Sequence, residues 1–188
     1  MATRGEFWIA GVSALLAVPA LVLSGVFLAL FFGGAGDFYG SLNDFFTALV
    51  MALLVPPALA LPKVVGVAGG RWFRVVTWLS IAGLALATVG QLLLIVRVIS
   101  LGMSFVTGSL GILPVVAWGG AQTYLGIRHG TPSRSVGWTI GAALAFSVLL
   151  TLAWSIGLDV GIWLLSIALL AALIGYLTLL GRRLLRYA

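Results

Sequence analysis

The sequence lacks cysteine and contains a single histidine, His129. Without thiols the chain can form no disulfide, no thiolate metal site and no cysteine nucleophile. One histidine also excludes Cys/His zinc patterns and bis-histidine haem ligation within the chain. We therefore expect no metal and no cofactor, and this shortage of catalytic groups argues against an enzyme.

Charged residues are also scarce in this sequence. Only 7% of the 188 residues are charged and 62% are hydrophobic, whereas soluble domains carry roughly 25% charged residues. A soluble chain of this size could not cover its surface with so few charges, so the expected partner for most of its length is the lipid bilayer. The net charge is +6, but the cations are scattered between apolar segments. They form no basic face with interleaved aromatics, so we expect no nucleic-acid partner.

What the sequence has instead is six long apolar segments, and a spanning helix needs about 20 such residues. The segments cover residues 7–32, 44–62, 74–99, 105–127, 136–157 and 160–181. The first is too long for the apolar core of a signal peptide, which has roughly 7–15 residues. The sequence thus predicts an all-α fold, a polytopic bundle of six transmembrane helices that forms one integral membrane domain over residues 1–188.

Short polar or glycine-rich stretches separate these segments. GGAGDFYGSLND, residues 33–44, is predicted to be a turn, with Ser41 as the N-cap of the next helix and Asp44 three residues later. RHGTPSRS, residues 128–135, contains Pro132 and serines suited to starting a helix. SIGLDVG, residues 155–161, is predicted to be a minimal turn.

The distribution of charge predicts an orientation. If six helices alternate in direction, nine of the ten cations fall on one side of the membrane, and Asp37, Asp44 and Asp159 fall on the other. Positively charged loops remain cytoplasmic. Both termini are therefore predicted to lie in the cytoplasm, and the protein in the inner membrane of a bacterium.

Arg97 is the cation that departs from this rule. It lies near the outer end of the third segment, where its side chain can extend to the lipid head groups as an interfacial anchor. Alternatively it forms a functional ion pair with Asp37, Asp44 or Asp159, the acids predicted on the same side. Both interpretations stay open at this stage.

The third segment has distinct faces when it is wound as a helix of about 100° per residue. A polar stripe, which we expect to face the bundle, comprises Thr77, Ser80, Leu84, Thr88, Gln91 and Ile95. A small-residue stripe with Gly83, Gly90 and Arg97 lies nearly opposite, where another helix can pack closely. An apolar face predicted to contact lipid lies between the two stripes and comprises Trp78, Ala82, Ala85, Val89, Leu92 and Val96.

The polar stripe supplies the candidate ligand or pore residues, which are Thr77, Ser80, Thr88 and Gln91, joined by Gln122 of the fourth segment. Gln91 has an alternative role in an interhelical hydrogen bond, worth about 0.6–2 kcal/mol. Pro19 and Pro114 fall near the centres of the first helix of each three-helix half. Paired interruptions of this kind occur in transporters built from inverted halves.

Three functions stay open. The first is a non-enzymatic membrane subunit that packs against partner membrane proteins. The second is a small transporter or ligand-binding subunit that uses the polar stripe around Gln91 to hold a small apolar ligand. The third is an intramembrane lipid-modifying enzyme, for which acid, base and metal ligands are missing. A cavity that reaches Thr88, Gln91 or Gln122 would favour the second function.

In size and helix layout the chain is similar to the substrate-binding subunits of vitamin uptake transporters. It is also similar to several six-helix bacterial membrane families. No motif carries either resemblance, so neither assigns a role to any residue.

Overall fold

A computed structural model describes residues 3–188, without the side chains of residues 101, 105, 159 and 160. It contains six α-helices and one short 3-10 helix, η1. Their bounds are α1 (Arg4–Phe32), α2 (Asp37–Val65), η1 (Gly66–Gly69), α3 (Gly70–Ile95), α4 (Leu101–His129), α5 (Arg134–Ser155) and α6 (Asp159–Leu185). No residue in the described part of the chain is in a strand. The prediction of an all-α fold is confirmed.

The helices are long and apolar enough to cross a membrane. The candidate spans are Arg4–Phe32, Gly102–His129, Arg134–Ser155, Gly161–Leu185 and the continuous stretch Asp37–Ile95, which includes α2, η1 and α3. The outer surface of the bundle carries large apolar side chains such as Trp78 and Trp154, which are 64% and 70% exposed. A surface of this kind suits lipid rather than water, as expected for a membrane protein.

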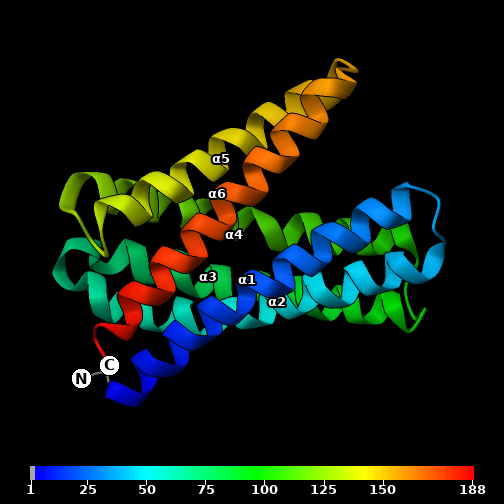
Figure 1. The fold of residues 1–188 in the computed structure, drawn as a ribbon. Coiled ribbons are helices and arrows are strands. Elements are labelled where there is room, and N and C mark those ends of the chain that lie inside the picture. Colours follow the sequence, from blue (N-terminus) through cyan, green and yellow to red (C-terminus); the bar gives the residue numbers. More distant parts are fainter. Residues whose placement is uncertain (1–2) are drawn as a thin grey trace.

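The six helices form a ring in sequence order. Each helix packs against the next one, and α6 packs against α1 to close the ring. Both termini, η1 and the α4–α5 connection lie at one end of the bundle, on the left in Figure 1. The other three connections lie at the opposite end, toward which the α5–α6 hairpin diverges from the remaining helices (Figure 1).

The cations gather at the end that carries the termini, which we call the basic end. They are Arg4, Lys63, Arg71, Arg74, Arg128, Arg134, Arg182, Arg183 and Arg186. Two contacts join helices here. Lys63 Nζ lies 2.9 Å from Glu6 Oε2 and links α2 to α1. Arg183 Nε donates a hydrogen bond of 3.0 Å to the carbonyl of Pro132 and links α6 to the α4–α5 connection. We call the opposite end the far end.

A cluster of buried apolar side chains occupies the half of the bundle nearest the basic end, which we call the basic half. Its members come from all six helices, and each lies in the basic half of its own helix. They are Ala10, Ala17, Ala58, Ala60, Leu61, Val65, Phe73, Trp118, Ala121, Leu125, Val136, Ile140, Ala143, Tyr176, Leu177, Leu180 and Leu184.

Glycine pairs bring helix backbones into contact in the basic half. A Cβ atom added at Gly126 of α4 would come within 2.6 Å of the Cα atom of Gly137 in α5. A Cβ atom added at Gly181 of α6 would come within 2.9 Å of the carbonyl oxygen of Gly11 in α1. Real Cβ contacts are essentially never this short, so only glycine allows these helices to pack as closely as they do.

The predicted faces of the third helix are confirmed up to Ile95, where α3 ends, but Arg97 lies beyond the helix and not on its small-residue stripe. Gly83 and Gly90 are buried against α4, where Gly83 meets the backbone of Gly111 and Gly90 meets the side chain of Thr107. Of the polar stripe, Thr77, Ser80 and Leu84 are buried, and Thr88, Gln91 and Ile95 are partly buried. The predicted lipid face is exposed throughout, at Trp78, Ala82, Ala85, Val89, Leu92 and Val96.

The predicted start of the second helix is wrong. α2 begins at Asp37 after Gly36, which makes no side-chain cap, so Ser41 and Asp44 lie inside the helix rather than at its start. The turn is shorter than predicted because Gly34 and Gly36 adopt φ angles of +84° and +112°. These conformations cost glycine little, and they let the chain reverse before residue 37.

The other two predicted connections are confirmed. Ser133 caps α5, where its hydroxyl accepts a hydrogen bond of 3.2 Å from the backbone N–H of Val136. The link between α5 and α6 is a minimal turn of residues 156–158, in which Gly157 has a φ of +68°.

Candidate functional site

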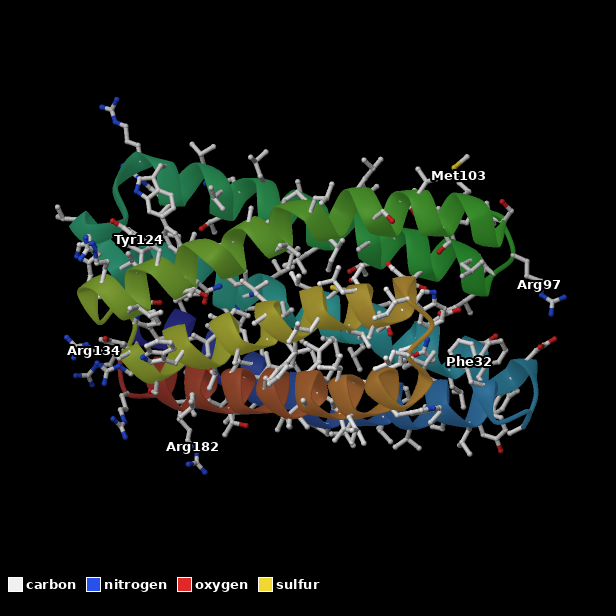
Figure 2. The ribbon with its side chains drawn as sticks, turned by 90° about the horizontal axis from the view of Figure 1, so that it is seen from above. Phe32, Arg97, Met103, Tyr124, Arg134 and Arg182 are labelled. Carbon is white, nitrogen blue, oxygen red and sulfur yellow. The ribbon has the colours of Figure 1, made fainter. Side chains whose placement is uncertain are left out.

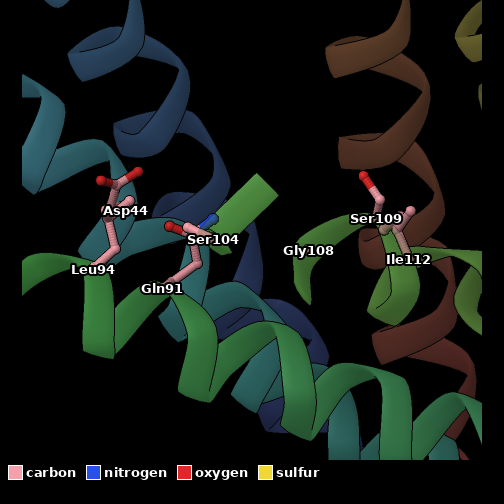
Figure 3. Close-up of a pocket in the computed structure, with 7 residues that line it drawn as sticks. All are labelled: Asp44, Gln91, Leu94, Ser104, Gly108, Ser109 and Ile112. Atoms are coloured by element: carbon pink, nitrogen blue, oxygen red, sulfur yellow. The ribbon is translucent and has the colours of Figure 1, made fainter. Parts of the chain in front are cut away.

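A cavity of about 430 Å³, open to the surface at the exposed residues Ser109 and Ile112, lies between α2, α3 and α4 in the half of the bundle nearest the far end, which we call the far half. Its lining residues are Asp44, Gln91, Leu94, Ser104, Gly108, Ser109 and Ile112. Figure 3 shows Asp44, Gln91 and Leu94 on one side of it and Ser109 and Ile112 on the other. Small-molecule sites typically measure roughly 300–1,000 Å³, so this cavity has the size to hold a small organic molecule.

The early start of α2 brings Asp44 into the cavity wall. Because α2 begins at Asp37, Asp44 lies in the second turn of a continuous helix and faces α3 and α4. Gly108 of α4 contributes open space, since a Cβ atom added there would meet nothing within 4 Å. By contrast, a Cβ atom on Gly111, less than one turn later, would come within 3.2 Å of the backbone nitrogen of Ala87. The cavity therefore lies beside the contact between α3 and α4, which continues past it at Gly90 and Thr107.

Gln91 reaches the cavity from the last part of α3, and its amide is not satisfied by the protein. Its Oε1 atom is buried and has no hydrogen-bond partner among the described residues. Leaving a buried amide oxygen unpaired costs about 1–3 kcal/mol. Rotation of the terminal amide exchanges its oxygen and its NH₂ group with little change in shape. The Gln91 amide is therefore available to donate to, or accept from, a molecule in the cavity.

A polar network connects Asp44 to the first helix. Ser24 Oγ in α1 donates a hydrogen bond of 2.8 Å to Asn43 Oδ1 and lies 2.9 Å from Thr47 Oγ1 in α2. Asn43 Nδ2 in turn donates to Asp44 Oδ1 over 3.4 Å. These bonds hold α1 on α2 but occupy only one acceptor position of the Asp44 carboxylate. Its remaining lone pairs are free for a donor from the cavity.

The hydroxyl groups of the polar stripe are used within the bundle instead. Thr77 and Thr88 each donate a hydrogen bond of 2.8 Å to the carbonyl four residues earlier in α3. Ser80 donates to the carbonyl of Pro114 over 2.7 Å and so binds α3 to α4. Gln91 is the member of the predicted ligand set that lines the cavity.

Gln122 lies outside the cavity, in the core of the basic half. Its Oε1 accepts a hydrogen bond of 2.8 Å from the hydroxyl of Tyr176 in α6, which joins two helices that are not neighbours in the ring. Within the described residues, Gln122 Nε2 and Trp118 Nε1 are buried without a partner. Tyr176 is not among the residues predicted from the sequence, although it is the one tyrosine of α6 and could have been noticed as such.

Arg97 lies at the far end and extends away from the bundle (Figure 2). Its φ of +58° is unusual for a residue other than glycine. Among the described side chains, Arg97 forms no ion pair with Asp37 or Asp44. The predicted pairing with Asp159 involves a side chain outside the described residues. The outward direction of Arg97 suits an anchor at the lipid head groups.

Taken as a binding site, the cavity offers a carboxylate, an amide and two hydroxyl groups beside apolar side chains. Over the described residues, no three or more His, Asp or Glu side chains come together as they would around a metal ion. The chain matches no known protein-family model, and comparisons with curated proteins and with solved structures gave no match.

Proposed function

We propose that the chain is an integral membrane protein that binds a small molecule in the cavity between α2, α3 and α4. The observation that carries this proposal is the cavity itself, which reaches Gln91, where the protein leaves an amide oxygen unpartnered. A subunit that only packs against its neighbours needs no such space. A few oriented polar groups among apolar walls are typical of sites that bind small molecules. Such a protein acts as a carrier, a receptor or a transporter subunit rather than as an enzyme.

The proposal includes six membrane spans in the inner membrane of a bacterium, with both termini in the cytoplasm. Nine of the ten cations lie at the end that carries the termini, and Arg97 lies at the other. A cytoplasmic location for this end follows from the retention of positively charged loops on that side of the membrane.

Packing against a partner membrane protein is a second candidate function. The α5–α6 hairpin diverges from the other helices toward the far end (Figure 1). It exposes large apolar side chains, at Val148, Leu149, Leu152, Trp154, Ile156, Leu158, Trp163, Leu164 and Ile167. A partner helix would replace lipid on this surface.

Native mass spectrometry of the protein, gently extracted from its own membrane, tests the first candidate. We expect a small molecule to be retained on the native chain and Gln91→Leu to weaken its retention about fivefold, as the loss of one hydrogen bond of about 1 kcal/mol would. Thr88→Val is the matched control, because the Thr88 hydroxyl bonds within α3 and does not line the cavity.

Equal retention by the Gln91→Leu variant and the native chain would contradict the proposed site. A native chain that carries no small molecule would contradict it as well. A second protein retained at fixed stoichiometry, with no small molecule, would favour the partner-binding function instead.

A further inference from the structure

Among the described side chains, one ionisable group lines the cavity, and that group is an acid. Asp44 is the only ionisable side chain among the seven lining residues. The cation of the far end, Arg97, extends away from the bundle (Figure 2). The remaining cations lie at the basic end, along the length of the helices from Asp44. A molecule in the cavity therefore meets a carboxylate with no basic side chain beside it.

The Asp44 carboxylate is also short of partners. Among the described side chains no lysine or arginine nitrogen lies within 4.0 Å of it, and its one hydrogen bond, from Asn43, is long at 3.4 Å. Acids within membrane helices are costly unless they pair with a cation or with several donors. The protein leaves that requirement unmet, so a charged donor from outside the chain would stabilise this site.

The other lining groups complete the description of the ligand. Ser104 and Ser109 place hydroxyl oxygens in the wall, and Gln91 offers its amide. These groups can accept hydrogen bonds from a cationic nitrogen, which carries several donors and no acceptor. Leu94 and Ile112 provide apolar surface for the rest of the molecule. An apolar body that bears an ammonium group satisfies both parts of the cavity.

From these observations we infer that the cavity takes an amphiphilic organic ammonium ion, whose charged nitrogen lies at Asp44 and whose apolar body lies against Leu94 and Ile112. The inference rests on the proposed function of the same cavity and adds its ligand class. It separates this site from one for neutral lipids or for organic anions, both of which would leave the carboxylate unpaired.

Three probes with the same apolar cage test the charge requirement directly: 1-aminoadamantane, 1-adamantanol and adamantane-1-carboxylate. Binding to the full chain in phosphatidylcholine nanodiscs is measured by equilibrium dialysis, with empty nanodiscs subtracting partition into lipid. We expect the amine to bind at least about tenfold more tightly than the alcohol, because it alone supplies the missing charge. The carboxylate should bind most weakly.

Two matched variants locate this preference. Asp44→Asn removes the charge in the cavity and should bring the amine to the affinity of the alcohol. Asp37→Asn removes the same charge from the same helix, but Asp37 is exposed and does not line the cavity. It should leave the tenfold preference intact, which separates a site effect from general attraction of cations to the surface. Elution volume and unfolding temperature establish that each variant is folded.

An alcohol that binds as tightly as the amine would overturn the inference, and so would a preference that survives in folded Asp44→Asn. In either case the proposed function would stand if Gly108→Leu, which fills the cavity, abolished binding of the alcohol. Absence of binding by all three probes would also overturn the inference, and the retention test on Gln91→Leu would then decide the proposed function separately. The preference of the native chain for the amine over the alcohol is measured without any variant. It therefore tests the inference even if Asp44→Asn does not fold.

Discussion

The basic half and the far half of this bundle differ in packing, although glycines also bring α3 onto α4 in the far half. In the basic half, apolar side chains from all six helices form one core, and glycine pairs bring α4 onto α5 and α6 onto α1. In the far half, α1 and α2 are joined through Ser24 and Asn43, a cavity separates parts of α2, α3 and α4, and the α5–α6 hairpin diverges. The ligand space thus lies in the far half in the proposed orientation, beside the contact between α3 and α4.

Glycine illustrates the difference within a single helix. Gly126, in the basic half of α4, is required because a side chain there would collide with the backbone of Gly137. Gly108, in the far half of α4, leaves space that no atom of the protein fills within 4 Å. The same residue type allows close packing at Gly126 and leaves space at Gly108, so its neighbours rather than its identity decide its role.

The largest effect should come from chemical labelling of the two ends. The chain has no cysteine, so single cysteines report without background. We expect an impermeant maleimide to label Ala35→Cys in intact cells and to leave Val67→Cys unlabelled until the cells are permeabilised. Ala35 lies in the α1–α2 connection at the far end, and Val67, which is 99% exposed, lies in η1 at the basic end. Labelling of Val67→Cys alone in intact cells would reverse the proposed orientation.

A smaller but still large effect should separate two glycines of α4. Gly126→Ala should lower the free energy of unfolding by about 1–3 kcal/mol, because overpacking forces the helices apart. Gly120→Ala is the matched control, since its Cβ atom would meet nothing within 4 Å. It should leave stability unchanged or raise it by about 0.5–1 kcal/mol through its higher helix propensity. Denaturant titration in detergent measures both, and equal losses would show that close packing at Gly126 is unimportant.

The sequence was a good guide wherever one helix could be considered alone. The faces of α3 were predicted correctly because helical periodicity fixes which residues lie together, whatever the helix packs against. The start of α2 was missed because Ser41 resembles an N-cap, whereas the turn is set by the backbone conformations of Gly34 and Gly36. Side-chain type signals a capping residue, but it says little about where a glycine-rich turn ends.

The contacts that define the candidate site could not be predicted from the sequence. Gln91 was singled out correctly as a polar residue that faces the bundle, but its neighbours Ser104 and Ser109 come from another helix. Their positions depend on the rotation of α4 about its axis, which the contact between Gly83 and Gly111 fixes. In the same way, the pairing of Gln122 with Tyr176 depends on the arrangement of the whole ring.

That pairing gives a prediction of intermediate size for the basic half. Tyr176→Phe and Gln122→Leu should each lower the free energy of unfolding by about 0.6–2 kcal/mol, because each removes the same interhelical hydrogen bond. The double variant should lower the free energy of unfolding by less than the sum of the two single losses, since the second change leaves no partner unpaired. A double-mutant cycle measures this difference, and strict additivity would argue that the bond contributes nothing.

The smallest effect is expected at the far end. Arg97→Gly should raise stability by less than about 1 kcal/mol, because glycine adopts the positive φ of this position without strain but loses more entropy on folding. Arg97→Lys keeps the Cβ atom and the charge, so it should leave the unfolding temperature unchanged. Destabilisation by both variants would indicate that the guanidinium makes a contact that stabilises the far end.

The closure of the ring by α1 and α6 has a consequence for biosynthesis. Gly11 lies against Gly181, and the ring centroids of Phe7 and Tyr187 are 5.6 Å apart, so α1 completes its packing on α6, which is made after the other five described helices. At roughly 5–20 residues per second, ribosomes take on the order of ten seconds to travel from α1 to the end of α6. During that interval the face of α1 that α6 will cover, which includes Gly11 and Gly25, is open to other membrane helices. The newly made chain is therefore most vulnerable to wrong partners before α6 is inserted.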